Sequence, residues 1–149
     1  MEIAIALAGP DDTPILIKLM QEYYAYDRIA FDEAASLSAL RDLLAHQDLG
    51  RVWLVHLNDS PVGYAVLTFG YSLEFHGRDA FIDELYIQEP YRGRRIGTQT
   101  LRFVESAARS LGIRAIHLEV ERDNEQAQRF YKSVGFTARD CFFLMSRPL

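Results

Sequence analysis

Two periodicities of apolar residues alternate along the chain. A repeat of two residues marks half-buried strands, and a repeat of three to four residues marks helices. Leu16, Leu19 and Met20 illustrate the second pattern, in a helix that begins near Thr13. The predicted strands cover 2–8, 51–57, 62–71, 80–87, 115–120 and 141–145. The other predicted helices cover about 34–46, about 97–111 and a last segment that Asp123 caps and Gly135 ends.

The order of these elements predicts an α/β fold. Turn residues at 58–61 join two strands into an antiparallel hairpin, and the later strands alternate with helices. We therefore expect a mixed, mostly antiparallel sheet with helices on both faces. No linker or repeat interrupts the chain, so we expect a single domain over 1–149.

Composition narrows the class of protein. The chain is 49% hydrophobic and 25% charged, which is typical of globular domains. No apolar run approaches the roughly 20 residues that cross a membrane. The first residues lack the basic region of a secretory signal, and the single cysteine, Cys141, cannot form an internal disulfide. We expect a cytoplasmic protein without a membrane partner.

The charge balance bears on partners. A net charge of −5 disfavours nucleic acid, which basic surfaces bind, and suits a cationic substrate such as an amine. The four histidines, at 46, 56, 76 and 117, show no metal-ligand spacing, so we expect no metal.

The segment 91–98, YRGRRIGT, lies between a predicted strand and a predicted helix. The N-terminus of a helix attracts phosphate, because its N–H groups are unpaired and carry partial positive charge. Gly93 and Gly97 allow a ligand to approach the backbone closely, and three arginines add charge. The segment is neither a Walker loop nor a dinucleotide fingerprint. The alternatives are an unrelated phosphate binder and a basic surface turn.

Two segments resemble a known family. Residues 83–97 look like motif A of the GNAT superfamily of N-acetyltransferases, a strand that leads into R/Q-x-x-G-x-G/A. Arg92 and Gly97 match its first and last fixed positions, and Arg95 replaces the middle glycine. An arginine there still offers its backbone N–H if its φ and ψ are ordinary. Residues 124–136 are similar to motif B, in the family's order and spacing.

The resemblance implies a function. It implies acetyl-coenzyme A as co-substrate and direct transfer of its acetyl group to a primary amine of a small molecule or peptide. The alternative is a catalytically silent acetyl-coenzyme A sensor or partner module. The implied cofactor contacts are Leu85, Tyr86, Ile87, Arg92, Gly93, Arg94, Arg95, Ile96, Gly97, Thr98, Asn124 and Tyr131.

The same resemblance implies catalytic roles. Tyr131 would be the general acid, since a phenol of pKa ~10 can protonate a departing thiolate. Its alternative role is a core aromatic beside Phe130. The general base is Glu84 or Glu119, or water without a fixed residue. Asp83 adjoins Glu84, and alternation along a strand places the two on opposite faces.

For the acceptor, the resemblance implies the first two helices, their connection and the loop before the cofactor strand. We expect Tyr24, Asp27, Glu33 and Asp83 to contact it, because aromatic faces with carboxylates suit an organic cation. Glu33 can instead be an ordinary residue at a helix start. On resemblance alone we also expect a homodimer.

Overall fold

The computed structural model describes residues 1–149, in two compact units, Met1–Leu118 and Glu119–Leu149. The first unit holds one five-stranded sheet with the order β1-β2-β3-β4-β5. Its strands are β1 (Ile3–Leu7), β2 (Gly50–Leu57), β3 (Ser60–Ser72), β4 (Gly77–Ile87) and β5 (Ala115–His117). Neighbours from β1 to β4 are antiparallel, and β5 joins β4 in parallel.

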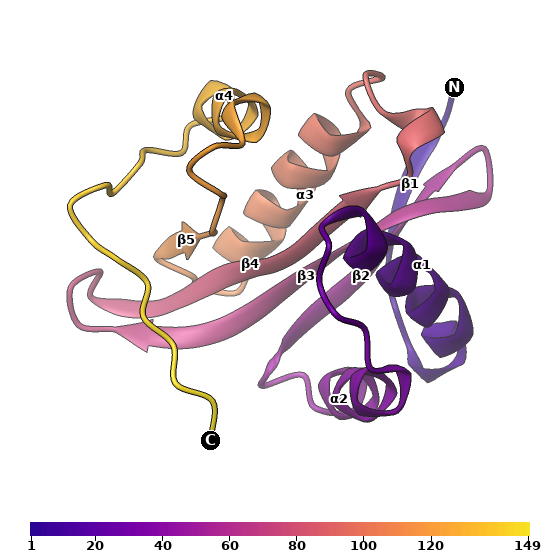
Figure 1. Ribbon diagram of the computed structural model, residues 1–149, viewed down its shortest axis with the longest axis horizontal. Coiled ribbons are helices and arrows are strands. Elements are labelled where there is room, and N and C mark those ends of the chain that lie inside the picture. The colour runs from indigo at the N-terminus through magenta and orange to yellow at the C-terminus, as the bar shows by residue number, and fades with distance from the viewer. The chain divides into compact units, whose positions relative to one another are not determined.

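The helices of the first unit cover both faces of this sheet (Figure 1). They are α1 (Thr13–Tyr26), α2 (Glu33–Ala45) and α3 (Ile96–Ser110), with short 3-10 turns η1 (Pro10–Asp12) and η2 (Glu89–Tyr91). The second unit contains α4 (Glu125–Ser133). The predicted α/β fold, a mixed and mostly antiparallel sheet with helices on both faces, is therefore confirmed.

Burial on both faces explains the sheet. Alternate residues of β2 point to opposite sides, so Leu54 packs with α1 and α2 while Val55 joins the cluster that contains Ile96 of α3. Trp53, on the α3 side, meets Phe103 of α3 edge-on, with ring centroids 5.9 Å apart. A strand covered on both faces needs a nearly continuous apolar run, and β2 has one.

A β-bulge interrupts β4. Val66 of β3 lies opposite Glu84, whereas the next residue, Leu67, lies opposite Ile82, so Asp83 is the extra residue. A bulge bends a strand and changes the direction of its side chains. The alternation argument that placed Asp83 and Glu84 on opposite faces is therefore not valid at this point of the strand.

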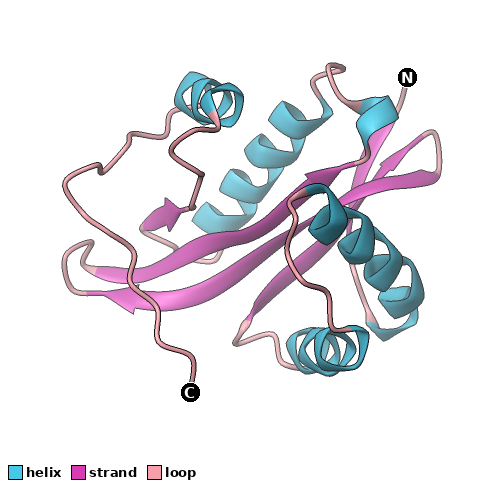
Figure 2. Cartoon of the chain, in the orientation of Figure 1, coloured by secondary structure: helices cyan, strands magenta, loops and turns pink.

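The predicted strand near the C-terminus is wrong. Residues 141–145 are not a strand, and Figure 2 shows the chain after α4 as loop. The side chains of residues 142–145 are between 61% and 89% exposed. Strand propensity in an apolar run has effect only where a neighbouring strand pairs with it, and none does here. Two smaller corrections are that β5 ends at His117 and that Asn124, rather than Asp123, caps α4.

No helix of the structure is both long enough and apolar enough to span a membrane.

The close pairing of β3 and β4 generates a test at Gly63. A Cβ atom on Gly63 would lie 2.3 Å from the carbonyl oxygen of Tyr86, so Gly63→Ala forces the two strands apart. We expect it to lower the free energy of unfolding by about 2 kcal/mol. Urea denaturation measures this. Gly9→Ala is the control, because a Cβ there meets nothing within 4 Å. Equal midpoints for the two variants would contradict the tight packing.

Candidate active site

A half-buried carboxylate follows the β4 bulge directly. The Tyr64 hydroxyl donates to Glu84 Oε1 at 2.6 Å, and the Tyr24 hydroxyl donates to Glu84 Oε2 at 2.7 Å. Tyr64, on β3, is fully buried, and Tyr24, on α1, is half-buried. Three elements that are distant in sequence thus converge on one carboxylate.

The surroundings of Glu84 shift its pKa in opposing directions, with a net rise. Burial raises the pKa of Glu84 and the charge of Asp83 raises it further, while the hydrogen bonds from Tyr64 and Tyr24 lower it. Burial also raises the pKa of Asp83. The pKa values of Tyr24 and Tyr64 are raised as well, by burial first and then by Glu84, so both phenols remain protonated donors. A carboxylate with a raised pKa is suited to general-base catalysis.

The edge of β4 is open beside this carboxylate. Pairing with β5 stops at Phe81, which lies opposite His117. The Gln88 N–H donates to Val62 of β3 at 2.9 Å, so by alternation the backbone groups of Leu85 and Ile87 face away from β3. No strand of Met1–Leu118 pairs with them there. This edge can offer backbone N–H groups to a bound chain or to an oxyanion.

The side chains of Tyr86 and Ile87, at the end of β4, are buried in the core. Tyr86 packs in the cluster beneath α1 and α2, and Ile87 packs against Ile96 on the other face. A cofactor contact by these residues would therefore use the backbone. The same holds for Ile96, whose side chain is 1% exposed.

The loop before α3 contains two residues with positive φ and leads into an uncapped helix. Gly93 has φ +74°, Arg95 has φ +63°, and no side chain caps the N-terminus of α3. The residues from Arg92 to Arg95 are exposed, so the first N–H groups of α3 and the side chains of Arg94 and Arg95 surround an accessible turn. The Arg94 guanidinium lies 5.7 Å from the ring centroid of Tyr91. These features fit a pyrophosphate such as that of coenzyme A. Gly97 and Thr98 follow in the first turn of α3.

Arg95 does not meet the condition of ordinary φ and ψ. Its φ of +63° and ψ of 12° lie in the left-handed region, which costs a residue with a Cβ about 1–2 kcal/mol. Glycine adopts this conformation readily. The backbone therefore has the shape that the motif's missing glycine would give it.

Arg92 is turned away from the loop. Its Nε donates to the carbonyl oxygen of Ile87 at 2.8 Å, and its guanidinium lies 4.2 Å from the ring centroid of Tyr26. The side chain thus connects the end of β4 to the end of α1. A second link is the hydrogen bond of 2.9 Å from Gln88 Nε2 to Glu22. No local pattern in the sequence indicates either contact.

Two of the predicted acceptor residues lie on the connection between α1 and α2. Asp27 and Glu33 are exposed at the two ends of the α1–α2 connection.

The second unit holds three of the predicted site residues. Asn124 Oδ1 accepts the Ala127 N–H at 3.1 Å as the cap of α4. Tyr131 packs against Phe130 and Phe136, with centroids 5.2 and 5.8 Å away, and Glu119 is exposed. The structure therefore brings together Tyr24, Asp83 and Glu84 in the first unit, while Asn124, Tyr131 and Glu119 belong to the second.

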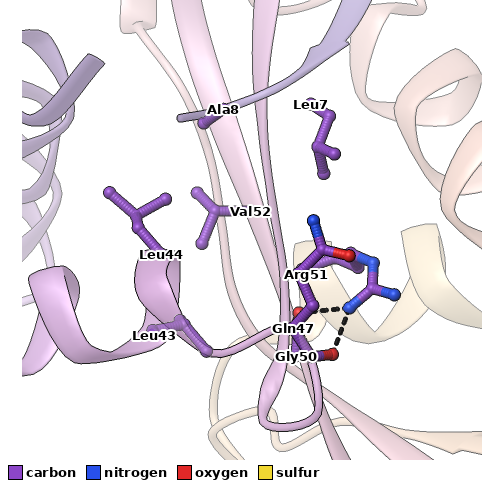
Figure 3. Close-up of a pocket in the computed structure, with 8 residues that line it drawn as sticks. All are labelled: Leu7, Ala8, Leu43, Leu44, Gln47, Gly50, Arg51 and Val52. Atoms are coloured by element: carbon purple, nitrogen blue, oxygen red, sulfur yellow. Dashed lines mark hydrogen bonds between the residues drawn. The ribbon is translucent and has the colours of Figure 1, made fainter. Parts of the chain in front are cut away.

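A hollow elsewhere in the first unit contains none of the predicted residues. Figure 3 shows its lining, which is Leu7, Ala8, Leu43, Leu44, Gln47, Gly50, Arg51 and Val52. There the Arg51 guanidinium donates to the carbonyl oxygens of Gln47 and Gly50, the latter at 2.8 Å. These contacts join the segment after α2 to β2.

The model of the Acetyltransferase (GNAT) family matches residues 16–136. The chain belongs to the GNAT family of acetyltransferases. GNAT proteins generally use acetyl-coenzyme A as co-substrate and act on amines. The open β4 edge and the loop before α3 are in accord with that membership.

Other GNAT proteins and one solved structure resemble this chain. YycN of Bacillus subtilis, an uncharacterized N-acetyltransferase, is 35% identical over 99 residues, which are 66% of this chain and 61% of that protein. Thialysine N-epsilon-acetyltransferase of Bos taurus is 25% identical over 142 residues, which are 89% of this chain and 83% of that protein. An integron cassette protein from the Cole Harbour Salt Marsh metagenome superposes with a TM-score of 0.86 at 32% identity, covering 97% of this chain and 90% of that one.

The left-handed conformation of Arg95 generates a test of the loop. Arg95→Gly and Arg95→Ala both remove the guanidinium, but only glycine removes the backbone strain. We expect the glycine variant to be more stable than the alanine variant by about 1 kcal/mol in urea denaturation, because glycine's greater unfolded-state entropy offsets part of the relief. An alanine variant as stable as the glycine variant would show that position 95 is not held in this conformation.

Proposed function

We propose that the chain transfers the acetyl group of acetyl-coenzyme A to a primary amine of a small molecule or peptide. The observation that carries the proposal is the Glu84 carboxylate, held by two phenols at the bulge and followed by the open edge of β4. A base, backbone donors and a phosphate turn thus follow one another within a short segment. The Bos taurus relative, named for an N-epsilon-acetyltransferase activity on thialysine, supports a small amine as acceptor.

The reaction balances with Glu84 as the base. A primary amine is mostly an ammonium at neutral pH, so one proton must leave before the nitrogen can attack. Glu84 accepts that proton. The amine nitrogen then forms a bond to the thioester carbonyl carbon. As the carbon–sulfur bond breaks, the nitrogen gives up a second proton, which balances the proton that the departing sulfur takes up. The backbone N–H of Ile87 is our choice of donor to the oxyanion that develops on the carbonyl oxygen.

The general acid in this proposal is Tyr131, which gives its proton to the departing sulfur. The support is its place in the segment that resembles motif B and the pKa of about 10 of an ordinary phenol. Asn124, in the same segment, would hydrogen-bond the cofactor arm with its side-chain nitrogen, because its Oδ1 already accepts from Ala127. Glu119 is the alternative base.

The acceptor side in this proposal includes the half-buried Tyr24 and the exposed carboxylates of Asp83, Asp27 and Glu33. Carboxylates beside aromatic rings attract an organic cation. We also propose that the two units form one N-acetyltransferase domain, since the family match at 16–136 crosses their boundary. A homodimer, a cytoplasmic location and the absence of nucleic acid remain predictions.

Glu84→Gln tests the base. We expect kcat/KM to fall by about 10²- to 10⁴-fold, because the amide cannot accept the proton. The measurement is thiol release from acetyl-coenzyme A with polyamines, amino acids, aminoglycosides and peptides. Glu119→Gln is the comparison for the alternative base, and with Glu84 as the base we expect its rate to be near that of the unmodified chain. If Glu119→Gln is slow and Glu84→Gln is not, the two roles are exchanged. If no amine supports thiol release, the transferase proposal fails.

Tyr131→Phe tests the acid. We expect kcat to fall by at least about tenfold while coenzyme A binds with unchanged affinity, since only the proton donor is lost. Thiol release gives kcat and calorimetry gives the affinity. Tyr71→Phe is the control, because Tyr71 is 72% exposed on β3. An unchanged kcat in Tyr131→Phe would remove Tyr131 from the mechanism.

A further inference from the structure

The two phenols that bind Glu84 differ in their access to solvent. Tyr64 is fully buried, and it lies in a strand that pairs with β2 on one side and β4 on the other. Tyr24 is half-buried near the end of α1, where its ring packs edge-on against Tyr23 and Phe31 at 5.6 and 5.4 Å. The first hydroxyl cannot reach a substrate, whereas the second lies at the margin of the core.

Each phenol occupies a different oxygen of the carboxylate. Tyr64 donates to Oε1 at 2.6 Å, and Tyr24 donates to Oε2 at 2.7 Å. Strand pairing explains why Tyr64 can do so, since it lies on the same sheet face as Glu84, diagonally across the β3–β4 pair. An oxygen that a buried donor holds is fixed in orientation, so the other oxygen is the one that an incoming amine can reach.

We propose that Tyr64 is a positioning residue that fixes the Glu84 carboxylate through Oε1, and that Tyr24 marks the face from which the acceptor amine approaches Oε2. The inference rests on the proposed function, in which Glu84 is the base. It adds Tyr64, which the sequence motifs do not include, and it assigns the two tyrosines different kinetic effects.

The pH dependence follows from the groups that face Glu84. These are Tyr64 on β3, Tyr24 on α1 and the adjacent Asp83 on β4. Both phenols lower the pKa of Glu84, while burial and Asp83 raise it. The base acts when deprotonated, so activity is present above its pKa and is lost below it. Removing either hydroxyl raises the pKa of Glu84 and moves the acidic limb of kcat/KM to higher pH.

The test compares Tyr64→Phe, Tyr24→Phe and the control Tyr71→Phe across pH, with amine and acetyl-coenzyme A varied separately. For Tyr64→Phe we expect an acidic limb at higher pH and a kcat about tenfold lower, with the KM for amine unchanged, because a hydrogen bond to a charged group is lost away from the acceptor. For Tyr24→Phe we expect the same direction of pH shift with a raised KM for amine. A Tyr64→Phe profile that superposes on that of the unmodified chain would overturn the proposal, as would a raised KM for amine in Tyr64→Phe alone.

A double-mutant cycle separates this inference from the proposed function. If Glu84 is the base and Tyr64 acts through it, Tyr64→Phe has no further effect on kcat in the Glu84→Gln background. Additive losses would overturn the positioning role while Glu84 remained the base. An unaltered rate in Glu84→Gln alone would instead refute the proposed base.

A second variant covers loss of folding in Tyr64→Phe. Site-specific 3-fluorotyrosine at position 64 keeps the hydroxyl and makes it more acidic, so it is a stronger donor to Oε1. The acidic limb is then expected to move to lower pH, opposite to the shift in Tyr64→Phe. A limb that stays in place would overturn the proposal.

Discussion

The pairing of β3 with β4 is the constraint on which the candidate site depends. Their ladder is continuous except at Asp83, where one extra residue is inserted in β4. Beyond the insertion Glu84 lies opposite Val66 and two residues before Tyr86, on the same sheet face as Tyr64. Because the same ladder holds β4 from one side only beyond Phe81, it also leaves the far edge of the strand available. This strand pair thus positions both the candidate base and the backbone donors.

Much of this arrangement could be predicted from the sequence. Alternation predicted the strands over 62–71 and 80–87, and the arginine-rich turn predicted the loop before α3. Both are local signals. Glu84 was named as a candidate base from its place in the second of these strands. Tyr64 was missed. Its hydroxyl, in a buried strand, needs a partner, but which one depends on the register with β4, and the bulge sets that register. A bulge has no reliable local signature.

Other errors have different physical causes. Residues 141–145 have the composition of a strand. Strand formation also needs a second segment that pairs with the first, and an exposed segment without such a partner strand remains a loop. Arg92 remains a predicted cofactor contact, but the stacking of its side chain on Tyr26 and its hydrogen bond to the Ile87 carbonyl were missed, because these contacts need the three-dimensional approach of α1 to η2. The Tyr24–Glu84 contact was half anticipated, since both residues were candidates but their direct hydrogen bond was not.

The left-handed Arg95 shows what the loop before α3 requires. The requirement is a pair of backbone angles, and glycine is one way among several to satisfy it. Asparagine, which tolerates the same angles better than most residues, is a further acceptable occupant. Sequence patterns written in terms of glycine therefore describe the commonest solution rather than the geometric rule. A loop with a larger side chain at this position can thus keep the backbone shape that a glycine-based pattern describes, as Arg95 does in this chain.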